Sequence, residues 1–330
     1  MKKILITGAS GQDGQILSYK LSQENCYVIG LGKKRPLFDQ LIPKHNYHFV
    51  EIDLTNFSEL QNLLNLHRPD VIFNLASLSS VKASWQYPEV NFLINQDLPI
   101  YILDWIVQTA PNTKFIQASS SEIFGGLTES PQNEMTNLAP ITPYGLAKAN
   151  AHEYTIALRD QGITASTAIL YNHESPLRDK TFITQKISMI AASYQLGRDI
   201  TEIPIGNASA TRDWGWAPDY VDAMLLIMND MNANDKGVDY VISTGIKHSV
   251  MDLMNIAFDY VDFQGWQKLL IQNSDDHRKI DPSSLLGNSE KIEKNLGWVP
   301  RVDFSTIVQL MIKSEICNMS SHPSFEWLKI

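Results

Sequence analysis

A tyrosine and a lysine stand four residues apart in the stretch PITPYGLAKANAHEY, as Tyr144 and Lys148. Tyr144 follows a proline and precedes good helix formers, so the spacing predicts that both side chains share one face of a helix. An ammonium group one turn away stabilises a phenolate, and we expect it to lower the pKa of Tyr144 toward neutrality. Such a tyrosine can exchange protons with a substrate hydroxyl. The same spacing also describes an ordinary surface pair, so the neighbouring motifs must decide between the two interpretations.

Three glycines near the N-terminus predict a dinucleotide site. Gly8, Gly11 and Gly14 follow the apolar run ILIT and precede a predicted helix over residues 15–23. The order strand, tight turn, helix is the one that lets a backbone approach a diphosphate closely. A glycine triplet alone also occurs in ordinary turns, but this order favours dinucleotide binding.

The end of the second predicted strand indicates which dinucleotide the site binds. That strand runs through VIG and ends in the letters GKKR, so Lys34 and Arg35 stand where an acidic residue would bind the ribose 2'-hydroxyl of NAD. Cations without a carboxylate fit a 2'-phosphate, and we therefore expect NADP. A solvated basic turn is the alternative.

The next predicted strands end at the same crevice. HFVEIDLTN ends in Asp53 and Leu54, where an adenine would lie, and the strand over residues 71–77 has an exit loop over residues 74–77. A helix over residues 91–108 precedes the strand KFIQASS, which ends in a serine run and Glu122. Since parallel strands present their carboxyl ends to one crevice, we expect Ser120 and Glu122 beside the Tyr144 helix.

The alternation of strands and helices predicts an α/β fold with a doubly wound parallel (Rossmann) sheet. A further strand ends at residue 172, helices are expected over residues 184–196 and 220–231, and a strand near residues 240–243 should return to the sheet. The Rossmann domain would comprise residues 1–171 and 213–245. A smaller C-terminal substrate-binding lobe of residues 172–212 and 246–330 would cap the crevice.

Composition narrows the class of protein. The chain has 330 residues, a formal net charge of −9 and a hydrophobic fraction of 44%. The acidic balance argues against nucleic-acid binding, and no run is long and apolar enough for a membrane span. The two cysteines, Cys26 and Cys317, predict no disulfide framework, and the scattered histidines predict no metal site. These features suit a cytoplasmic protein.

Seven segments carry a resemblance to a known family: TGASGQDG, NLASLSSV, ASSSEIFG, YGLAK, YNHESPLRDKTFITQKI, GNASATRDWG and RKIDPSSLLG. Together they resemble the extended short-chain dehydrogenases/reductases that act on nucleotide sugars, and most closely the GDP-mannose 4,6-dehydratases. The glycine turn and YGLAK are general to the superfamily, whereas NHESP and RDWG in this order are more specific. The resemblance covers nearly the whole chain.

The resemblance implies a catalytic set of Ser120, Glu122, Tyr144 and Lys148. Tyr144 would take the proton of the sugar 4-hydroxyl while a hydride passes from C4 to NADP, and Lys148 would hold the phenolate. The 4-ketone acidifies the C5 hydrogen, which Glu122 would remove. The 6-hydroxyl would leave as water with acid assistance from Glu122 or Ser120, and the hydride would return to C6.

The resemblance also implies the binding residues. We expect the cofactor to contact Gly8, Gly11, Gln12, Asp13, Gly14, Lys34, Arg35, Asp53, Leu54, Leu75, Ala76, Ser77, Tyr144, Lys148 and His173. We expect a nucleotide-sugar substrate, with a GDP-hexose favoured, to contact Ser79, Asn172, Lys186, Arg212 and Arg278. Arginine forks suit diphosphate oxygens. Arg212 beside Asp213 could equally form a structural ion pair.

The chain departs from the family pattern on the substrate side. Gln185 stands where an arginine is usual, Trp216 where a histidine is usual, and Lys279 where a proline is usual. The chain also lacks most of an insertion that commonly follows the GKKR stretch and that is associated with assembly. The resemblance therefore implies a homodimer, formed by the Tyr144 helix and the helix over residues 91–108, and leaves a tetramer open.

Two other functions remain open at this point. An NADP(H)-dependent 4-ketosugar reductase or epimerase needs only the hydroxyl, the tyrosine and the lysine, so Glu122 is the residue that separates it from a dehydratase. A non-catalytic dinucleotide sensor is the third interpretation, although both Tyr144 and Lys148 are present.

Overall fold

The computed structural model describes residues 1–234, 236–272 and 285–330. A seven-stranded sheet forms the larger part, in the order β10-β6-β5-β4-β1-β2-β3, and every neighbouring pair in it is parallel. Its strands are β1 (Lys2–Thr7), β2 (Cys26–Gly32), β3 (Tyr47–Glu51), β4 (Val71–Asn74), β5 (Lys114–Ser120), β6 (Ala165–Leu170) and β10 (Tyr240–Ile242). The predicted doubly wound sheet is confirmed, including the late strand that returns to it.

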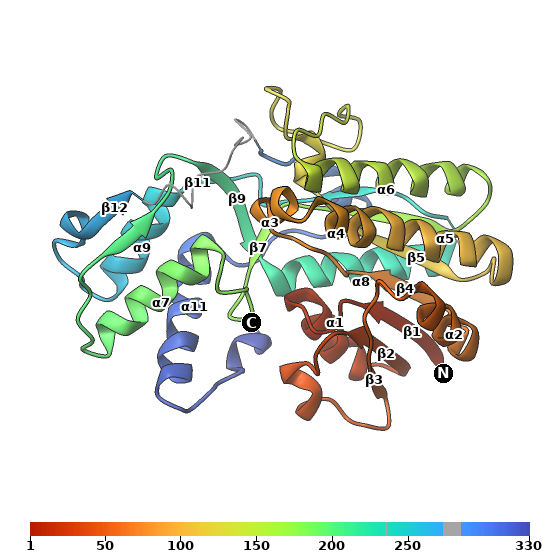
Figure 1. The fold of residues 1–330 in the computed structure, drawn as a ribbon, viewed down its shortest axis with the longest axis horizontal. Helices are drawn as coiled ribbons and strands as arrows, with labels where there is room; N and C mark the ends of the chain where they lie inside the picture. The colour runs from red at the N-terminus through yellow and green to blue at the C-terminus, as the bar shows by residue number, and fades with distance from the viewer. Residues whose placement is uncertain (235, 273–284) are drawn as a thin grey trace.

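Helices cover both faces of this sheet (Figure 1). One face carries α1 (Gln12–Ser22) and α8 (Ala217–Asn234), which contact each other. The other face carries α2 (Phe57–His67), α5 (Leu98–Thr109) and α6 (Pro143–Asp160). The short helices α3 (Val81–Gln86) and α4 (Pro88–Phe92) lead into α5. Both layers bury aliphatic and aromatic side chains against strands whose own residues are buried, which is the composition expected of a parallel sheet covered on both sides.

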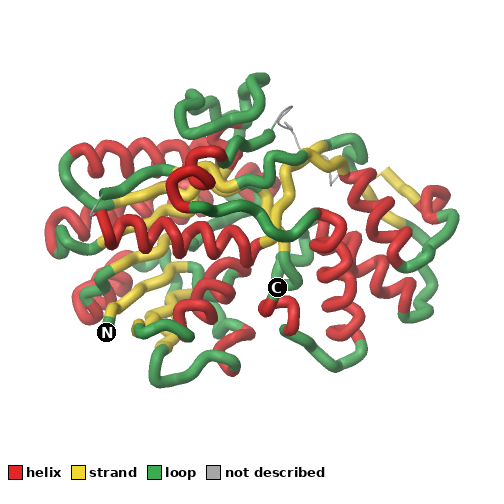
Figure 2. The backbone as a smooth tube through the Cα atoms, turned by 180° about the vertical axis from the view of Figure 1, so that it is seen from behind, coloured by secondary structure: helices red, strands yellow, loops and turns green. Residues whose placement is uncertain are grey.

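The smaller lobe is built mainly from helices. It contains α7 (Ile183–Gln195), α9 (Val250–Tyr260) and α11 (Phe304–Met319), which contact one another around a separate apolar core. Two small sheets accompany them, β11-β9-β7 and β12-β8. Their strands are β7 (Asn172–Glu174), β8 (Ile203–Ile205), β9 (Thr211–Trp216), β11 (Lys247–Ser249) and β12 (Leu270–Gln272). Figure 2 shows this lobe beside the sheet from the opposite side.

The remaining short elements connect or close these parts. They are 3₁₀ turns at Leu37–Gln40, Ser121–Phe124, Trp266–Leu269 and Glu326–Lys329, a π-helical turn at Leu93–Asp97, and helix α10 (Glu290–Leu296). Helix α10 contacts α8 and β10, and Trp327 packs against Phe38 and Trp216 in the core of the larger part. The C-terminal stretch thus touches both parts of the molecule. The domain boundaries given above stay a prediction.

Several element boundaries differ from the sequence prediction. Helix α1 begins at Gln12 rather than residue 15, because the helix starts directly after the Gly11 turn. The helix expected over residues 91–108 is interrupted by the π-helical turn between α4 and α5. The strand expected to end at residue 172 stops at Leu170, and Asn172 opens β7 in another sheet. Among the described residues, no helix is long and apolar enough to cross a membrane.

Candidate active site

The glycine turn sits at the centre of the sheet, where the strand order reverses between β1 and β4. Gly8 has a φ of +71°, and a Cβ on it would lie 2.7 Å from the backbone nitrogen of Ala76 after β4. A Cβ on Gly14 would lie 2.3 Å from the Gly8 carbonyl oxygen. Both positions therefore require glycine. The turn leaves the N-terminus of α1 open to an anion, which is the geometry that fits a dinucleotide diphosphate.

A crevice beside this turn collects most of the predicted catalytic and cofactor residues. Its lining includes Gly8, Gly11, Gln12, Asp13, Gly14, Leu75, Ser77, Ser79, Ser120, Glu122, Tyr144, Lys148, Asn172 and His173. Strands β1, β4, β5 and β6 supply it from their carboxyl ends, since Thr7 is in register with Asn74 and Ser120 with Leu170. Parallel pairing thus brings together residues that lie far apart in the sequence.

Close backbone packing places Glu122 against the tyrosine helix. Thr142 caps α6, because its side-chain oxygen accepts from the Gly145 nitrogen at 2.9 Å. A Cβ on Gly145 would lie 2.5 Å from the Glu122 carbonyl oxygen, so the glycine after the tyrosine lets the two segments touch. Tyr144 and Glu122 are both buried, with 7% and 6% of their surface exposed.

The electrostatics of the Tyr-Lys pair differ from the sequence prediction. Burial raises the pKa of Tyr144, and hydrogen bonding with the Ser120 and Ser77 hydroxyls only partly offsets this. Lys148 is also buried, which lowers its pKa to about 7, and its Nζ donates to the Ala118 carbonyl oxygen at 2.9 Å. The Lys148 Nζ lies 5.9 Å from the centroid of the Tyr144 ring. The expected lowering of the Tyr144 pKa is therefore wrong for the protein alone, because desolvation outweighs the hydrogen bonds and the Arg178 charge that lower it.

A buried contact between a histidine and an aspartate joins the glycine turn to β7. His173 Nε2 lies 2.9 Å from Asp13 Oδ2, and Nδ1 lies 2.7 Å from the Tyr171 carbonyl oxygen. Gln12 reinforces the connection, since it donates to the His173 carbonyl oxygen at 3.0 Å and accepts from the Ser175 hydroxyl at 2.8 Å. The His173 ring stacks on Tyr220 with the centroids 4.7 Å apart.

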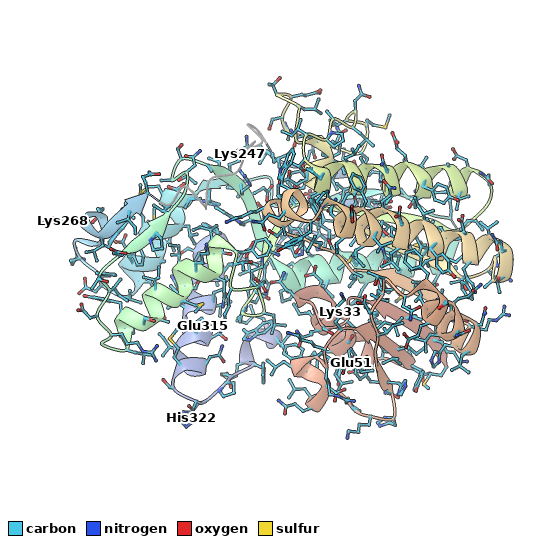
Figure 3. All side chains as sticks on the ribbon, in the orientation of Figure 1. Lys33, Glu51, Lys247, Lys268, Glu315 and His322 are labelled. Atoms are coloured by element: carbon cyan, nitrogen blue, oxygen red, sulfur yellow. The ribbon has the colours of Figure 1, made fainter. Side chains whose placement is uncertain are left out.

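The remaining predicted cofactor residues lie outside this crevice lining. Lys34, Arg35 and Asp53 are exposed, whereas Leu54 and Ala76 are buried. Arg35 forms an ion pair of 2.7 Å with Asp39, and Lys33 forms one of 3.2 Å with Asp53. Figure 3 labels Lys33 on this side of the molecule, at the end of β2, together with Glu51 at the end of β3. The basic turn thus has acidic neighbours of its own.

A second cavity adjoins the crevice and contains two of the predicted substrate cations. Lys186 and Arg212 line it, and Asn172 and Phe182 line both cavities. Arg212 donates to the Thr211 carbonyl oxygen at 2.7 Å. Successive residues of a strand point to opposite faces, so Asp213 points away from Arg212. Its carboxylate accepts hydrogen bonds from Thr244 and Gly245. Arg278 and Lys279 lie outside the described residues.

Two departures from the family pattern are packing residues here. Trp216 is fully buried and meets Trp327 edge to face. Gln185 is buried and donates to Glu315 Oε1 at 2.8 Å, which links α7 to α11. Glu315 is labelled on the smaller lobe in Figure 3. Trp214 lines the second cavity and stacks on Phe304.

Sequence reasoning missed some residues at the site. Lys82 lines the second cavity, and Asn95, which is fully buried, accepts from the Ser77 hydroxyl at 2.8 Å. Asn95 also donates to Asn91 Oδ1, four residues earlier. The sequence signal that could have identified these two asparagines is their spacing of one turn inside an otherwise apolar helix pattern. Glu174 and Arg178, 3.2 Å apart, form an internal ion pair, and Arg178 also lines the crevice.

The residues present fit a nicotinamide dinucleotide. The glycine turn provides a cradle that any Cβ would fill, and the buried Ser119 hydroxyl at its side has no hydrogen-bond partner among the residues that the structure describes. No three histidine, cysteine, aspartate or glutamate side chains in the described ranges could jointly hold a metal ion. The fold and this site define an extended short-chain dehydrogenase/reductase.

Comparison with known proteins identifies the family. The chain belongs to the family described as GDP-mannose 4,6 dehydratase, whose model matches residues 5–311. It is 33% identical to GDP-mannose 4,6 dehydratase 1 of Arabidopsis thaliana, over 96% of this chain and 90% of the relative. It is 32% identical to the GDP-mannose 4,6-dehydratase of Vibrio cholerae, over 97% of this chain and 95% of the relative.

Solved structures show the same fold at lower identity. A dTDP-glucose 4,6-dehydratase from Bacillus anthracis in complex with NAD has a TM-score of 0.79 and 19% identity, covering 95% of this chain and 96% of its own. RMD from Pseudomonas aeruginosa, complexed with NADPH, has a TM-score of 0.77 and 17% identity, covering 96% and 99%. Structures of this fold thus bind either nicotinamide dinucleotide.

Proposed function

We propose that this protein is a hydro-lyase that converts GDP-D-mannose into GDP-4-keto-6-deoxy-D-mannose and water, with NADP as a bound cofactor. The observation that carries the proposal is the position of Glu122. Its backbone packs against Gly145, so the carboxylate belongs to the same crevice as Ser120, Tyr144 and Lys148. Family membership over nearly the whole chain supports the reaction type.

The roles of the residues follow from their chemistry. Tyr144 as a phenolate takes the proton of the sugar 4-hydroxyl and becomes the neutral phenol, and the lysine ammonium one turn away stabilises the phenolate before this transfer. Glu122 then removes the C5 proton, which the 4-ketone has made acidic, and the 6-hydroxyl leaves with a proton as water. A bound nicotinamide dinucleotide would accept the hydride from C4 and return it to C6, so the reaction consumes no reducing agent. Glu122 or Ser120 provides the proton for the leaving hydroxyl.

The substrate diphosphate belongs to the second cavity in this proposal. Arg212 and Lys186 from the smaller lobe and Lys82 from α3 bring positive charge to its lining. Because the whole chain has a net charge of −9, this local concentration of cations is the feature that selects an anionic ligand. Asn172, which lines both cavities, would lie between the nucleotide and the reacting sugar.

Mass spectrometry of GDP-mannose incubated with the protein and NADP in heavy water tests the proposal. We expect loss of one water, one deuterium incorporated at C5, and no net formation of NADPH. Net consumption of supplied NADPH with a 4-keto sugar would instead establish a reductase. If GDP-mannose is unchanged, GDP-, CDP-, UDP- and dTDP-hexoses tested in parallel separate an altered substrate from an altered reaction.

NADP is the cofactor that the basic turn favours. Lys33, Lys34 and Arg35 are exposed at the end of β2, where the ribose 2'-position of a dinucleotide lies in this fold class. Arg35→Ala should weaken NADP binding about tenfold or more and leave NAD binding nearly unchanged, because an arginine fork binds only the 2'-phosphate. Calorimetric titration with both dinucleotides measures this. Lys44→Ala, also exposed, is the matched control, and equal weakening of NADP and NAD would contradict the assignment.

The proposal includes a cytoplasmic homodimer. Both cysteines are free thiols, and burial raises the pKa of Cys26 to about 11, which keeps it unreactive. Helices α4, α5 and α6 lie side by side on one face in Figure 1 and expose apolar side chains there. This face would form the four-helix interface between two copies.

A further inference from the structure

His173 is held between a backbone carbonyl and the carboxylate of Asp13, which both only accept hydrogen bonds when Asp13 is ionised. Nδ1 faces the Tyr171 carbonyl oxygen at 2.7 Å, and Nε2 faces an oxygen of Asp13 at 2.9 Å. A neutral imidazole carries a single N–H, so it can satisfy only one of these acceptors. The doubly protonated imidazolium satisfies both. His173 is only 8% exposed, so water cannot take over the second contact readily.

Asp13 stands in a place where a negative charge conflicts with the proposed cofactor. It lies in the first turn of α1, directly after the glycine turn, and lines the crevice. The N-terminus of that helix is the position that receives a diphosphate in a dinucleotide fold. An uncompensated carboxylate beside it would repel the ligand. The cation of His173 removes most of that charge.

The pKa directions agree with this geometry. Burial raises the pKa of Asp13, but the charge and hydrogen bond of His173, with Arg178 nearby, more than offset it and leave the pKa below its usual value. Burial lowers the pKa of His173, but the charge and hydrogen bond of Asp13 outweigh both burial and Arg178 and leave it raised. Both directions favour the charged pair, a carboxylate and an imidazolium, over the neutral pair.

We propose that His173 is a protonated counter-ion of Asp13 at neutral pH, which neutralises the glycine turn so that this turn accepts the diphosphate of the cofactor. This role rests on the proposed function only in requiring a dinucleotide. His173 is a positioning residue, because both of its nitrogens are engaged by the protein and neither is free to transfer a proton to a substrate.

The other groups that face His173 are consistent with a fixed charge. From its own segment, Glu174 and Arg178 form a separate ion pair of 3.2 Å, and Thr184 donates to Glu174 at 2.5 Å. From α8, the ring of Tyr220 covers one face of the imidazole at 23° to it. From α1, the facing groups are Asp13 itself and the neutral Gln12. Asp13 is thus the carboxylate that pairs with the imidazole ring.

A double-mutant cycle on dinucleotide affinity tests the counter-ion role. His173→Gln should weaken NADP binding about tenfold or more, because it leaves Asp13 charged without its cation. Adding Asp13→Asn to that variant should restore several-fold of the lost affinity, since the repelling charge is then gone. A purely structural contact predicts the opposite, namely that the double variant binds no better than His173→Gln. His45→Gln, at an exposed histidine, is the control.

Nitrogen NMR of ring-labelled protein tests the protonation state without any cofactor. Both nitrogens of His173 should carry protons at pH 7, and the titration midpoint should lie above the ordinary 6.5 and fall in Asp13→Asn. A singly protonated ring at pH 7 would overturn the proposal. If the wild type binds NADP or NAD but leaves GDP-mannose unchanged, the proposed reaction fails and the counter-ion role stands. Binding of neither dinucleotide would overturn that role.

Discussion

Lys148 is a buried cation at the site. It is 2% exposed, and its ammonium has a backbone carbonyl as hydrogen-bond acceptor. Burial of a cation is unfavourable, which is the reason for its lowered pKa. A pKa of about 7 keeps both protonation states accessible at neutral pH. In the proposed mechanism, Lys148 can therefore act as an ammonium beside the Tyr144 phenolate and still release a proton.

The stability of the protein should depend on this lysine and on pH. The pKa of Lys148 falls from 10.5 to about 7 on folding, so between these values the unfolded chain binds the proton that the folded chain releases. Stability therefore rises with pH across that window, and below it the folded state bears the full cost of the buried charge. Lys148→Met should raise the melting temperature by at least about 2 °C near pH 6 and by much less near pH 10. It should also abolish turnover.

Differential scanning calorimetry of the wild type and of Lys148→Met, near pH 6 and near pH 10, measures these melting temperatures. Lys44→Met, at an exposed lysine, is the control and should show no such pH dependence. An equal gain at both pH values would mean that packing, and not the buried charge, determines the effect.

In the proposed mechanism, Glu122 distinguishes a dehydratase from a simpler oxidoreductase. Glu122→Gln keeps the size of the side chain but removes its basicity, so water elimination should slow by about a hundredfold or more. Reduction of NADP in a single turnover should persist, because Tyr144 and Lys148 remain. Stopped-flow absorbance reports that reduction, and mass spectrometry reports the lost water. Glu129→Gln, an exposed residue nearby, should behave as the wild type. Retained elimination in Glu122→Gln would assign the base elsewhere.

At the level of elements, the contact between α6 and the turn after β5 determines the geometry of the site. The Thr142 cap fixes the start of α6, and the absence of a side chain at Gly145 allows the Glu122 carbonyl to approach. These two features place a tyrosine from one element and a carboxylate from another in one crevice. Neither residue type alone would indicate that arrangement.

Gly145→Ala should separate these elements. The added Cβ would meet the Glu122 carbonyl oxygen at 2.5 Å, which is backbone and cannot rotate away, so α6 must shift. We expect a folded protein whose turnover is about 10- to 100-fold lower, because a small misplacement of reacting groups has effects of that size. Steady-state kinetics measures the turnover, and circular dichroism shows whether the variant is folded. Glu153→Ala, exposed on the same helix, is the control, and unchanged turnover in Gly145→Ala would show that the contact is not needed.

At the scale of the whole molecule, helices α4, α5 and α6 expose apolar side chains to solvent in a single copy of the chain. Val90 is 44% exposed, Val107 is 42% exposed and Leu146 is 43% exposed. We expect light scattering to give twice the chain mass of 37.2 kDa, since pairing two such faces would bury these side chains.

A charge on this face should separate the copies. Leu146→Glu should give monomers, because two buried carboxylates would face each other across the twofold axis. Leu66→Glu places the same charge on α2 and should leave the mass unchanged. A wild-type monomer at micromolar concentration would contradict the predicted homodimer.

Much of the fold could be predicted because its signals are local. The apolar run before Gly8 and the glycine spacing correctly predicted β1, the turn and α1, and the alternation of strands and helices correctly predicted a doubly wound sheet. The motifs around Tyr144 and Glu122 pointed to the family that the comparisons confirm. Each of these inferences depends on residues that are close together in the chain, where spacing alone restricts the structure.

The tertiary structure decided the properties that depend on residues distant in the sequence. Burial depth reversed the expected direction of the Tyr144 pKa, because desolvation comes from the whole surrounding core. Asp13 and His173 are 160 residues apart, and only the packing of β7 against α1 brings them within hydrogen-bond distance. The sequence by itself determined which chemical groups the protein contains and which strands end in them. The packed fold alone determined their distances and charges, because electrostatic energy depends on separation in space and on exclusion of water.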